Sequence, residues 1–438
     1  MEPGGTQLQP GPLPAPNPAS ARFPCFDGLR AVAAGTVLIT HVSFNTTGNQ
    51  IAFFGAYFAR MDIGVAIFFV ISGFLLYRPF AARLINGQPL PDTKAYFTRR
   101  LVRIVPAYWV ILTLALFVFR VEPHARPIDM LWYYSFTQIY DKSHVMGGLT
   151  QAWSLCTEIT FYLFLPLFAA FMATVTRRRT TPEQRVRAQL VALGALYGVS
   201  LAFRVWDTSR WFGPKGQGFV MGPFHVTFGC ANSWLPATLD YFALGMLLAV
   251  AQSWAATTPD RRGRQLERLG ARPWVPWSLA LIAFWVVSKH AGLPIDVRPY
   301  GTGPLFARQA LYGLVAFLVL LPAVFGPQDR GLGRRLLRSR SMVWVGTVSY
   351  GVYLSHELWI KEFHDWTGIG TFRGGFLGMV TFVAVLTVAM ASVSYVVVER
   401  PILRRVRRPD PAAAPAGARP SDPTPVAATT RADPVPVP

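Results

Sequence analysis

Titratable side chains occur inside stretches of this sequence that are otherwise continuously apolar. His41 lies in such a stretch over residues 28–46, and Glu158 lies in another over residues 155–175. Charged or titratable groups at membrane depth are costly and by default mark a functional site. Imidazole titrates near neutral pH, and a neighbouring carboxylate fixes its tautomer, so together they suit general-base chemistry. The residue types therefore predict that His41 and Glu158 form a catalytic pair.

Arginines lie at or just before the start of such apolar stretches. Arg30 and His41 are eleven residues apart, which places both on one stripe of a helix, about 16 Å from each other. Arg100 and Arg103 are one helical turn apart, and guanidinium forks bind phosphate well. This layout predicts a long donor with a phosphate-bearing head at the arginines and a reactive end near His41. Acyl-coenzyme A has that form, so we expect it as a cosubstrate, with no bound cofactor.

The apolar stretches define the elements that position these residues. Hydrophobic residues make up 52% of the 438 positions and charged residues 15%, whereas soluble domains carry about 25% charge. The apolar residues come in blocks long enough to cross a hydrocarbon core of about 30 Å, and they do not alternate as barrel strands do. We predict an all-α membrane protein, a bundle of about ten transmembrane helices with both termini cytoplasmic. The expected helices cover 28–46, 62–80, 103–120, 155–175, 188–205, 235–254, 274–290, 305–325, 343–360 and 375–398.

The basic residues follow these helices in a regular way. Every second loop, together with the start of the C-terminal tail, holds 26 of the 42 Lys and Arg residues. This alternation is the positive-inside pattern of a multi-pass protein, and it predicts a cell inner (plasma) membrane location. The net charge of +20 would otherwise suggest nucleic acid. Because the charges come in short bursts between apolar spans, we expect no nucleic-acid partner.

The chain divides into three parts by composition. Residues 1–25 and 402–438 are expected to be disordered tails, the second one basic and then rich in Pro and Ala, and residues 26–401 form the transmembrane domain. Three cysteines, Cys25, Cys156 and Cys230, lack metal-ligand spacing, so neither a disulfide framework nor a metal site is predicted. The sequence leaves the oligomeric state open.

Helical rise places further titratable groups at the depth of His41. Asp62, Asp240 and His356, together with His41 and Glu158, are expected to share the outer third of the bilayer. The plain alternative is a structural network of buried polar groups. For His41 with Glu158 a functional interpretation is favoured, because the two residue types complement each other chemically.

A series of short motifs then points to a family. The ordered set resembles the acyltransferase-3 family of integral membrane O-acyltransferases, including its R-x10-H spacing at Arg30 and His41. These motifs are FDGLRAVA at 26–33, GVAIFFVISGF at 64–74, RLVR at 100–103, WSLCTE at 153–158, DYF at 240–242, SYGVYLSH at 349–356 and VERP at 398–401. They cover nearly the whole chain. Cys156 stands where the family often has serine, and we expect no appended hydrolase-like domain of the kind that some members carry.

The resemblance implies transfer of an acyl group from a cytoplasmic acyl-CoA to a hydroxyl of a sugar-containing acceptor. The acceptor could be a cell-envelope glycan, a glycolipid or a glycosylated metabolite, and the acyl chain length stays open. Carried over to this sequence, His41 is the general base, Arg30 helps to hold the donor, and Arg100 with Arg103 binds near its phosphates. Residues that could support the site are Asp62, Ser72, Tyr162, Asp240, Tyr353 and His356.

The sequence is also compatible with other functions. A transporter or flippase could use the buried histidines and carboxylates as a proton relay, and a non-catalytic sensor could bind a lipid or a sugar. Within the acyltransferase interpretation, direct attack of the acceptor is preferred over a covalent acyl-enzyme on Ser72. The Ser72-Gly73-Phe74 stretch is expected instead to allow close packing of helices.

Overall fold

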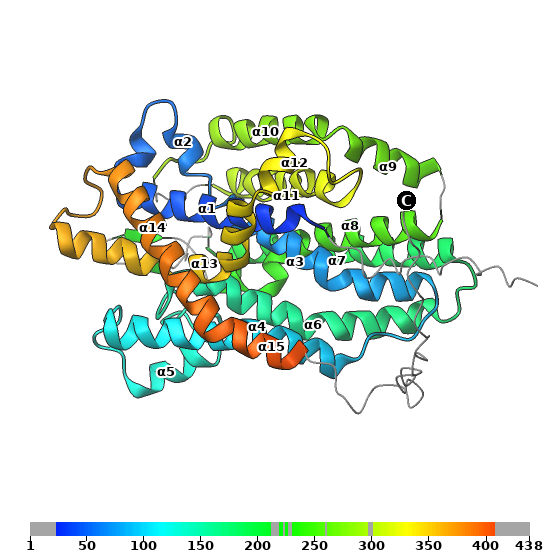
Figure 1. Ribbon diagram of the computed structural model, residues 1–438, viewed down its shortest axis with the longest axis horizontal. Coiled ribbons are helices and arrows are strands. Elements are labelled where there is room, and N and C mark those ends of the chain that lie inside the picture. Colours follow the sequence, from blue (N-terminus) through cyan, green and yellow to red (C-terminus); the bar gives the residue numbers. More distant parts are fainter. Residues whose placement is uncertain are drawn as a thin grey trace, which may run out of the picture.

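The structure is a computed structural model that describes residues 23–211, 219–221, 224–226, 230–258, 261–296 and 301–407. The predictions of disorder for residues 1–22 and 408–438 fall outside these ranges. The described chain is a helical bundle whose long helices run roughly along its longest axis (Figure 1).

The long helices correspond in order to the predicted ones, and the predicted class, an all-α membrane protein, is confirmed. They are α1 (Cys25–Asn45), α3 (Ile63–Ile85), α4 (Thr93–Thr113), α6 (Trp153–Thr176), α7 (Pro182–Trp211), α8 (Leu239–Thr257), α10 (Trp274–Lys289), α11 (Thr302–Val324), α13 (Arg340–Thr367) and α14 (Phe376–Ser394). Two of them end in π-helical turns, η3 (Leu114–Val118) after α4 and η8 (Tyr395–Glu399) after α14.

Short elements connect the long helices. The helices are α2 (Gly55–Phe58), α5 (Pro127–Tyr134), α9 (Arg261–Ala271), α12 (Leu332–Leu337) and α15 (Arg400–Arg407). The 3-10 turns are η2 (Gly48–Gln50), η4 (Gln138–Tyr140), η5 (Thr150–Ala152), η6 (Cys230–Ser233) and η7 (Leu235–Thr238). Strands β1 (Phe219–Met221) and β2 (Phe224–Val226) form one antiparallel hairpin in which Val220 pairs with His225.

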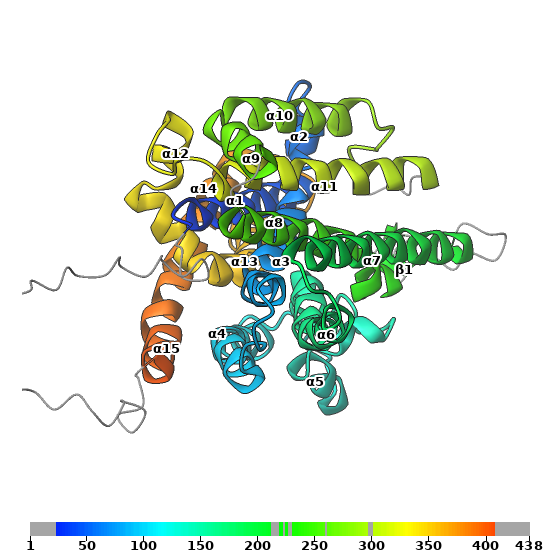
Figure 2. The same ribbon diagram turned by 90° about the vertical axis from the view of Figure 1, so that its right-hand side faces the viewer.

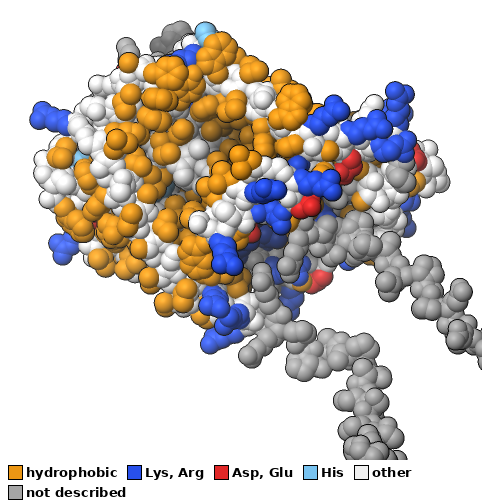
Figure 3. All heavy atoms as spheres, turned by 45° about the horizontal axis from the view of Figure 1, so that its top comes forward, with side chains coloured by type: hydrophobic (Ala, Val, Ile, Leu, Met, Phe, Trp, Pro, Cys, Tyr) orange, Lys and Arg blue, Asp and Glu red, His pale blue; other side chains and the backbone are white. Residues whose placement is uncertain are grey.

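The surface of the bundle is suited to lipid. Within the described residues, eight helical segments are long and apolar enough to cross a membrane, α10 is a shorter apolar helix, and α13 is interrupted by polar residues. Large apolar side chains such as Leu167, Leu281 and Leu377 are 71%, 69% and 77% exposed, which would be unfavourable in water over so wide an area. Figure 3 shows this apolar surface, with many Lys and Arg side chains gathered toward one end.

We call the end of the bundle that carries loops 86–92 and 177–181 and helices α9, α12 and α15 the basic end. α1, α3 and α8 lie in the middle, between α10 and α11 on one side and α4 and α6 on the other (Figure 2). Glycines allow the central helices to approach closely: a Cβ on Gly346 would lie 1.8 Å from the Asp27 carbonyl oxygen, and one on Gly73 would lie 2.3 Å from that of Phe242. The expected close packing at Ser72-Gly73 is therefore made by Gly73.

A buried arginine connects several helices at the basic end. The guanidinium of Arg334, 1% exposed, donates to the carbonyl oxygens of Gly270 at 2.6 Å, Pro322 at 2.7 Å and Phe325 at 3.2 Å. It thereby joins the ends of α9 and α11 to α12, and α12 in turn contacts the first turns of α1. Backbone carbonyls left by helix ends need such partners when they are buried.

Several predicted boundaries are wrong. Cys25, assigned to the disordered N-terminal tail, opens α1, and α7 and α13 extend beyond the predicted ranges 188–205 and 343–360 at both ends. α4 begins at Thr93 instead of residue 103, because Asp92 caps it by accepting hydrogen bonds from the backbone N–H groups of Lys94 at 3.2 Å and Ala95 at 2.8 Å. Residues 402–407, assigned to the disordered tail, belong to the helix α15. The first turns of α4 and the whole of α15 are polar, so a pattern of continuously apolar residues does not reveal them.

A polar cluster stabilises the long connection between α4 and α6, at the end opposite to the basic end. The His144 ring lies between two carboxylates, with Nδ1 2.6 Å from Asp141 Oδ2 and Nε2 3.1 Å from Asp129 Oδ1, and it stacks on Trp132. Burial disfavours the imidazolium, but the hydrogen bonds to Asp129 and Asp141 outweigh it and raise the pKa of His144. This cluster ties α5 to the loop that follows it.

Candidate active site

His41 forms its contacts with α13. Its Nδ1 atom is 2.7 Å from Nε2 of His356 and 3.1 Å from Oε1 of Glu357. α1 and α13 pack along each other, so these residues meet near the end of the bundle opposite to the basic end. His356 is 1% exposed, whereas the side chains of His41 and Glu357 are 32% and 25% exposed. We call these three residues the histidine centre.

The hydrogen bonds of the histidine centre fix its tautomers. His356 Nδ1 is 2.8 Å from the carbonyl oxygen of Tyr353 and 3.3 Å from that of Val352, and carbonyls only accept, so Nδ1 carries the proton. In the neutral ring Nε2 of His356 then accepts, and Nδ1 of His41 donates to it. Nε2 of His41 is consequently left with a free lone pair, which is the state a general base needs.

The same three residues offer two imidazole nitrogens and a carboxylate oxygen within 4.8 Å, which could hold a metal ion. The two rings are inclined by 7° with centroids 5.0 Å apart. An imidazole nitrogen lies about 1.15 Å from the centroid of its own ring. Twice this length, added to the 2.7 Å between His41 Nδ1 and His356 Nε2, gives the observed distance between the centroids. Both nitrogens therefore lie on the line that joins the centroids, as in an N–H···N hydrogen bond. Two ligands of a tetrahedral zinc would lie roughly 3.3 Å apart. The geometry therefore favours a hydrogen-bonded pair.

Glu158 is not the partner of His41, and the predicted pair is wrong in this respect. Glu158 Oε1 accepts a hydrogen bond from Tyr162 at 2.8 Å and another from Ser72 on α3. Helical rise gives the depth of a residue but not the direction in which it points. α6 packs against α3, α4 and α7, so Glu158 faces α3 instead of α1.

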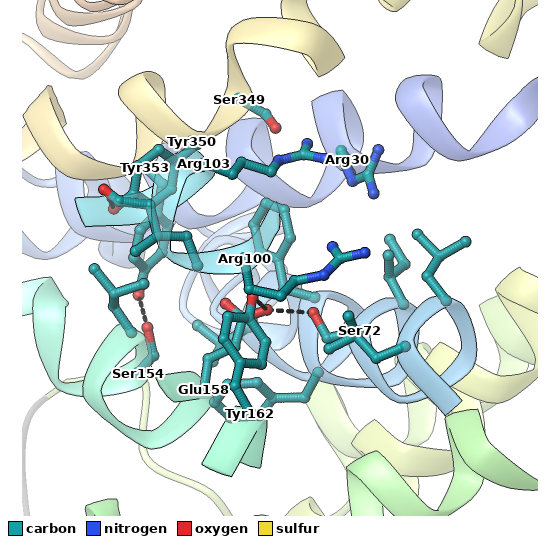
Figure 4. A pocket seen from close by; sticks show the side chains of 18 residues that line it. Arg30, Ser72, Arg100, Arg103, Ser154, Glu158, Tyr162, Ser349, Tyr350 and Tyr353 are labelled. Atoms are coloured by element: carbon teal, nitrogen blue, oxygen red, sulfur yellow. Dashed lines mark hydrogen bonds between the residues drawn. The ribbon is translucent and has the colours of Figure 1, made fainter. Parts of the chain in front are cut away.

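Glu158 instead lines a cavity of about 110 Å³ that we call the central chamber. Its polar wall contains Arg30, Ser72, Arg100, Arg103, Ser154, Glu158, Tyr162, Ser349, Tyr350 and Tyr353, and its apolar wall includes Phe68, Phe69 and Ile104. Figure 4 shows the guanidinium groups of Arg30 and Arg103 next to each other, with that of Arg100 nearby. The structure thus brings together all three predicted donor-binding arginines.

The arginines of the chamber differ in their partners. Arg30 forms an ion pair with Asp27 at 2.8 Å. Among the described residues, the side chains of Arg100 and Arg103 form neither a hydrogen bond nor an ion pair, and Nε of Arg100 is buried without a partner. Arg100 and Arg103 are half-buried, and guanidinium groups that are shielded from water are normally paired. Glu158 in the same wall interacts electrostatically with Arg100. Because three arginines lie with this one carboxylate in the wall, an excess of positive charge remains, which is suited to an anionic ligand.

The chamber ends close to the histidine centre. The Tyr353 hydroxyl is 2.6 Å from Ser154 Oγ and donates to the Gln151 carbonyl oxygen at 3.0 Å; the Ser154–Tyr353 bond is drawn at the left of Figure 4. The Tyr353 ring also lies 5.9 Å, between centroids, from that of His356. Tyr353 therefore stands between the chamber and the histidine centre, and the described lining of the chamber does not include His41.

Two predicted supporting residues lie in separate networks. Asp62 accepts hydrogen bonds from Arg308 and from the Tyr312 hydroxyl on α11. Asp240 accepts two hydrogen bonds from Gln309 Nε2, at 2.9 and 2.7 Å, and lies against α7 and α11. Asp240 is buried in a structural network with Gln309 and Ser200. Asp62 has a 26% exposed side chain and lies near enough to His41 to interact with it electrostatically.

Glu357 was not among the predicted site residues, although the sequence carries a signal for it. A carboxylate that directly follows a histidine at membrane depth is itself an expensive group and a candidate site residue. The predicted motif ends at His356, one residue before Glu357. Glu357 supplies the carboxylate that Glu158 was expected to provide.

Comparison with known proteins agrees with this picture. The chain is 24% identical over 399 residues to the O-acetyltransferase OatA of Staphylococcus aureus, covering 87% of this chain and 57% of that protein. It is 22% identical over 352 residues to the peptidoglycan O-acetyltransferase OatA of Listeria monocytogenes, covering 76% and 48%. The putative peptidoglycan O-acetyltransferase YrhL of Bacillus subtilis is 25% identical over 395 residues, covering 87% and 55%.

The chain spans about half the length of the curated relatives it matches. No solved structure matches it significantly. The family model described as an acyltransferase domain matches residues 23–399, which include the central chamber and the histidine centre. On this match, together with the ordered motifs, the chain belongs to the acyltransferase-3 family.

Proposed function

We propose that this protein is an O-acyltransferase of the bacterial plasma membrane that moves an acyl group from acyl-CoA to a hydroxyl of a sugar-containing acceptor. The basic end would face the cytoplasm and receive the donor. The names of the relatives suggest acetyl as the group to test first and a cell-wall glycan as the acceptor. The supporting observation is the central chamber, whose lining extends from Arg100 and Arg103 to Tyr353. The ring of Tyr353 lies next to that of His356, and His356 is the hydrogen-bond partner of His41.

In this mechanism Arg100 and Arg103 bind phosphates of the donor, and its flexible arm lies in the central chamber. Arg30 and His41 are eleven residues apart on α1, or about 16 Å along the helix, a span suited to the pantetheine arm of coenzyme A. Tyr353 would have to move aside for the thioester to reach His41. Glu158 holds Ser72 and Tyr162 in the chamber wall and has no part in proton transfer with His41.

The transfer itself is a single displacement. Nε2 of His41 takes the proton from the acceptor hydroxyl as that oxygen attacks the thioester carbonyl carbon. The new C–O bond forms, the C–S bond breaks, and the proton passes to the departing thiolate to give free coenzyme A. The imidazolium that exists in between has its Nδ1–H beside the Glu357 carboxylate, which stabilises the positive charge.

The test is acetyl transfer in membrane vesicles, measured as free coenzyme A and as esterified glycan. We expect His41→Ala to lower kcat by about 10²- to 10⁴-fold, the usual contribution of a general base. His290→Ala, which removes an exposed histidine outside both the chamber and the histidine centre, is the matched control. Transfer by His41→Ala at the wild-type rate would refute the mechanism, and movement of substrate without acyl donor would indicate a transporter.

A further inference from the structure

A second cavity lies at the basic end, between α4 and α15. Its volume is about 620 Å³, and α4 contributes Lys94, Thr98, Arg99, Arg100 and Arg103 to its wall, while α15 contributes Leu403 and Val406. We call it the basic vestibule. Arg100 and Arg103 line both the basic vestibule and the central chamber, so the two cavities meet at this pair of side chains.

The charges of the vestibule are unbalanced. Four cations, Lys94, Arg99, Arg100 and Arg103, face one carboxylate, Asp92. Both oxygens of Asp92 accept hydrogen bonds from the first turn of α4, so this carboxylate is already engaged. With the described residues, none of the four cationic side chains forms a hydrogen bond or an ion pair. A cavity of this kind is suited to a ligand that carries several negative charges.

Helix α15 supplies the apolar side of the vestibule. Leu403 and Val406 are three residues apart and therefore share one face of the helix, which is the face toward α4. Arg404 and Arg405 are exposed on the other side. The vestibule thus combines a cationic wall with an apolar wall, the combination that a phosphorylated nucleoside requires.

The shared arginines set the direction of a bound donor. If the thioester lies in the central chamber, the phosphates nearest to it meet Arg100 and Arg103 at the junction of the cavities. The remaining nucleotide end then lies in the vestibule. We propose that the basic vestibule binds the phosphorylated adenosine of a coenzyme A donor, with Lys94 and Arg99 contacting its ribose phosphate and α15 covering its base. This assignment rests on the proposed function, because it takes the donor to be a coenzyme A thioester.

The experiment compares two ligands that differ only in the ribose phosphate. Coenzyme A and dephospho-coenzyme A are titrated against the purified full chain in zwitterionic nanodiscs. For wild type we expect coenzyme A to bind about tenfold more tightly. In the double variant Lys94→Ala, Arg99→Ala we expect affinity for coenzyme A to fall about tenfold and affinity for dephospho-coenzyme A to change less than twofold, since two partly exposed charge contacts are lost.

The control removes the same charge elsewhere at the basic end. Arg177→Ala with Arg178→Ala changes two exposed arginines that line neither cavity, and it should leave both affinities within twofold. A loss equal to that of the vestibule variant would mean that only the overall charge matters, which overturns the assignment. Equal binding of both ligands to wild type would also overturn it while leaving the proposed function intact. Failure of wild type to bind either ligand would instead remove the proposed donor.

Discussion

Replacing Glu357 by glutamine tests which carboxylate supports His41. The substitution keeps the size of the side chain and an oxygen in the place of the one that lies 3.1 Å from His41 Nδ1, but it removes the negative charge. It should therefore leave the neutral ground state nearly unchanged. Its effect should appear when His41 becomes positively charged during transfer.

The size of the effect follows from the geometry. Two unit charges about 4 Å apart attract by about 4 kcal/mol at an effective dielectric constant of about 20. His41 carries only part of a charge in the transition state, and the side chains are 32% and 25% exposed, so we expect about half of this energy. A loss of about 2 kcal/mol corresponds to a fall in kcat of about 30-fold. KM for the donor should stay constant, because Glu357 does not line the central chamber.

The assay is acceptor-dependent release of coenzyme A from acetyl-CoA by membrane vesicles, at saturating donor and over a donor titration. Glu362→Gln is the matched control, because Glu362 lies on the same helix and its nearest cation, Lys361, is 3.9 Å away. Unchanged kcat in Glu357→Gln would refute the reasoning. If Glu158→Gln instead lowered kcat at constant KM, the partnership first expected for His41 would be restored.

Three further results are expected. Arg100→Ala with Arg103→Ala should raise KM for acetyl-CoA about 100-fold, more than it lowers kcat, because two charge-assisted phosphate contacts are lost; steady-state kinetics decides. Arg334→Ala should cost about 3 kcal/mol by leaving buried carbonyls unpaired, and thermal unfolding in detergent should show a Tm lower by several degrees. Because the pKa of His144 is raised, protonated His144 stabilises its loop below pH about 6.5, and this stability disappears as pH rises through the folded-state pKa. Hydrogen exchange over Asp129 and the rest of α5 should accelerate accordingly, and His144→Gln should abolish that pH dependence.

In the proposed mechanism two tasks are separated along the bundle. Phosphate recognition is assigned to Arg100 and Arg103, near the basic end, and proton transfer is assigned to His41, near the other end. Tyr353 lies between them and contacts both regions through its hydroxyl and its ring. Variants at one end should therefore affect donor binding and variants at the other end should affect turnover, which the two sets of kinetic experiments can distinguish.

The sequence alone determined the membrane-spanning helices, because lipid requires long apolar segments with internally bonded backbones. It also placed Arg30, Arg100 and Arg103 in one region, since the starts of helices that cross the membrane in the same direction lie at the same end of a bundle. It failed at polar boundaries: the first turns of α4 and the whole of α15 carry charges that an apolar pattern does not detect.

The partner of His41 was decided by tertiary structure. Helical rise assigned the same depth to Glu158, Asp62 and Asp240, but depth leaves the rotation of each helix and the choice of its neighbours undetermined. Close approach at Gly346 set α1 against α13, which brought His356 and Glu357 to His41. α6 packed on α3 and turned Glu158 into the central chamber. One-dimensional periodicity gives heights along the membrane normal, whereas side-chain packing between helices determines which residues at that height meet.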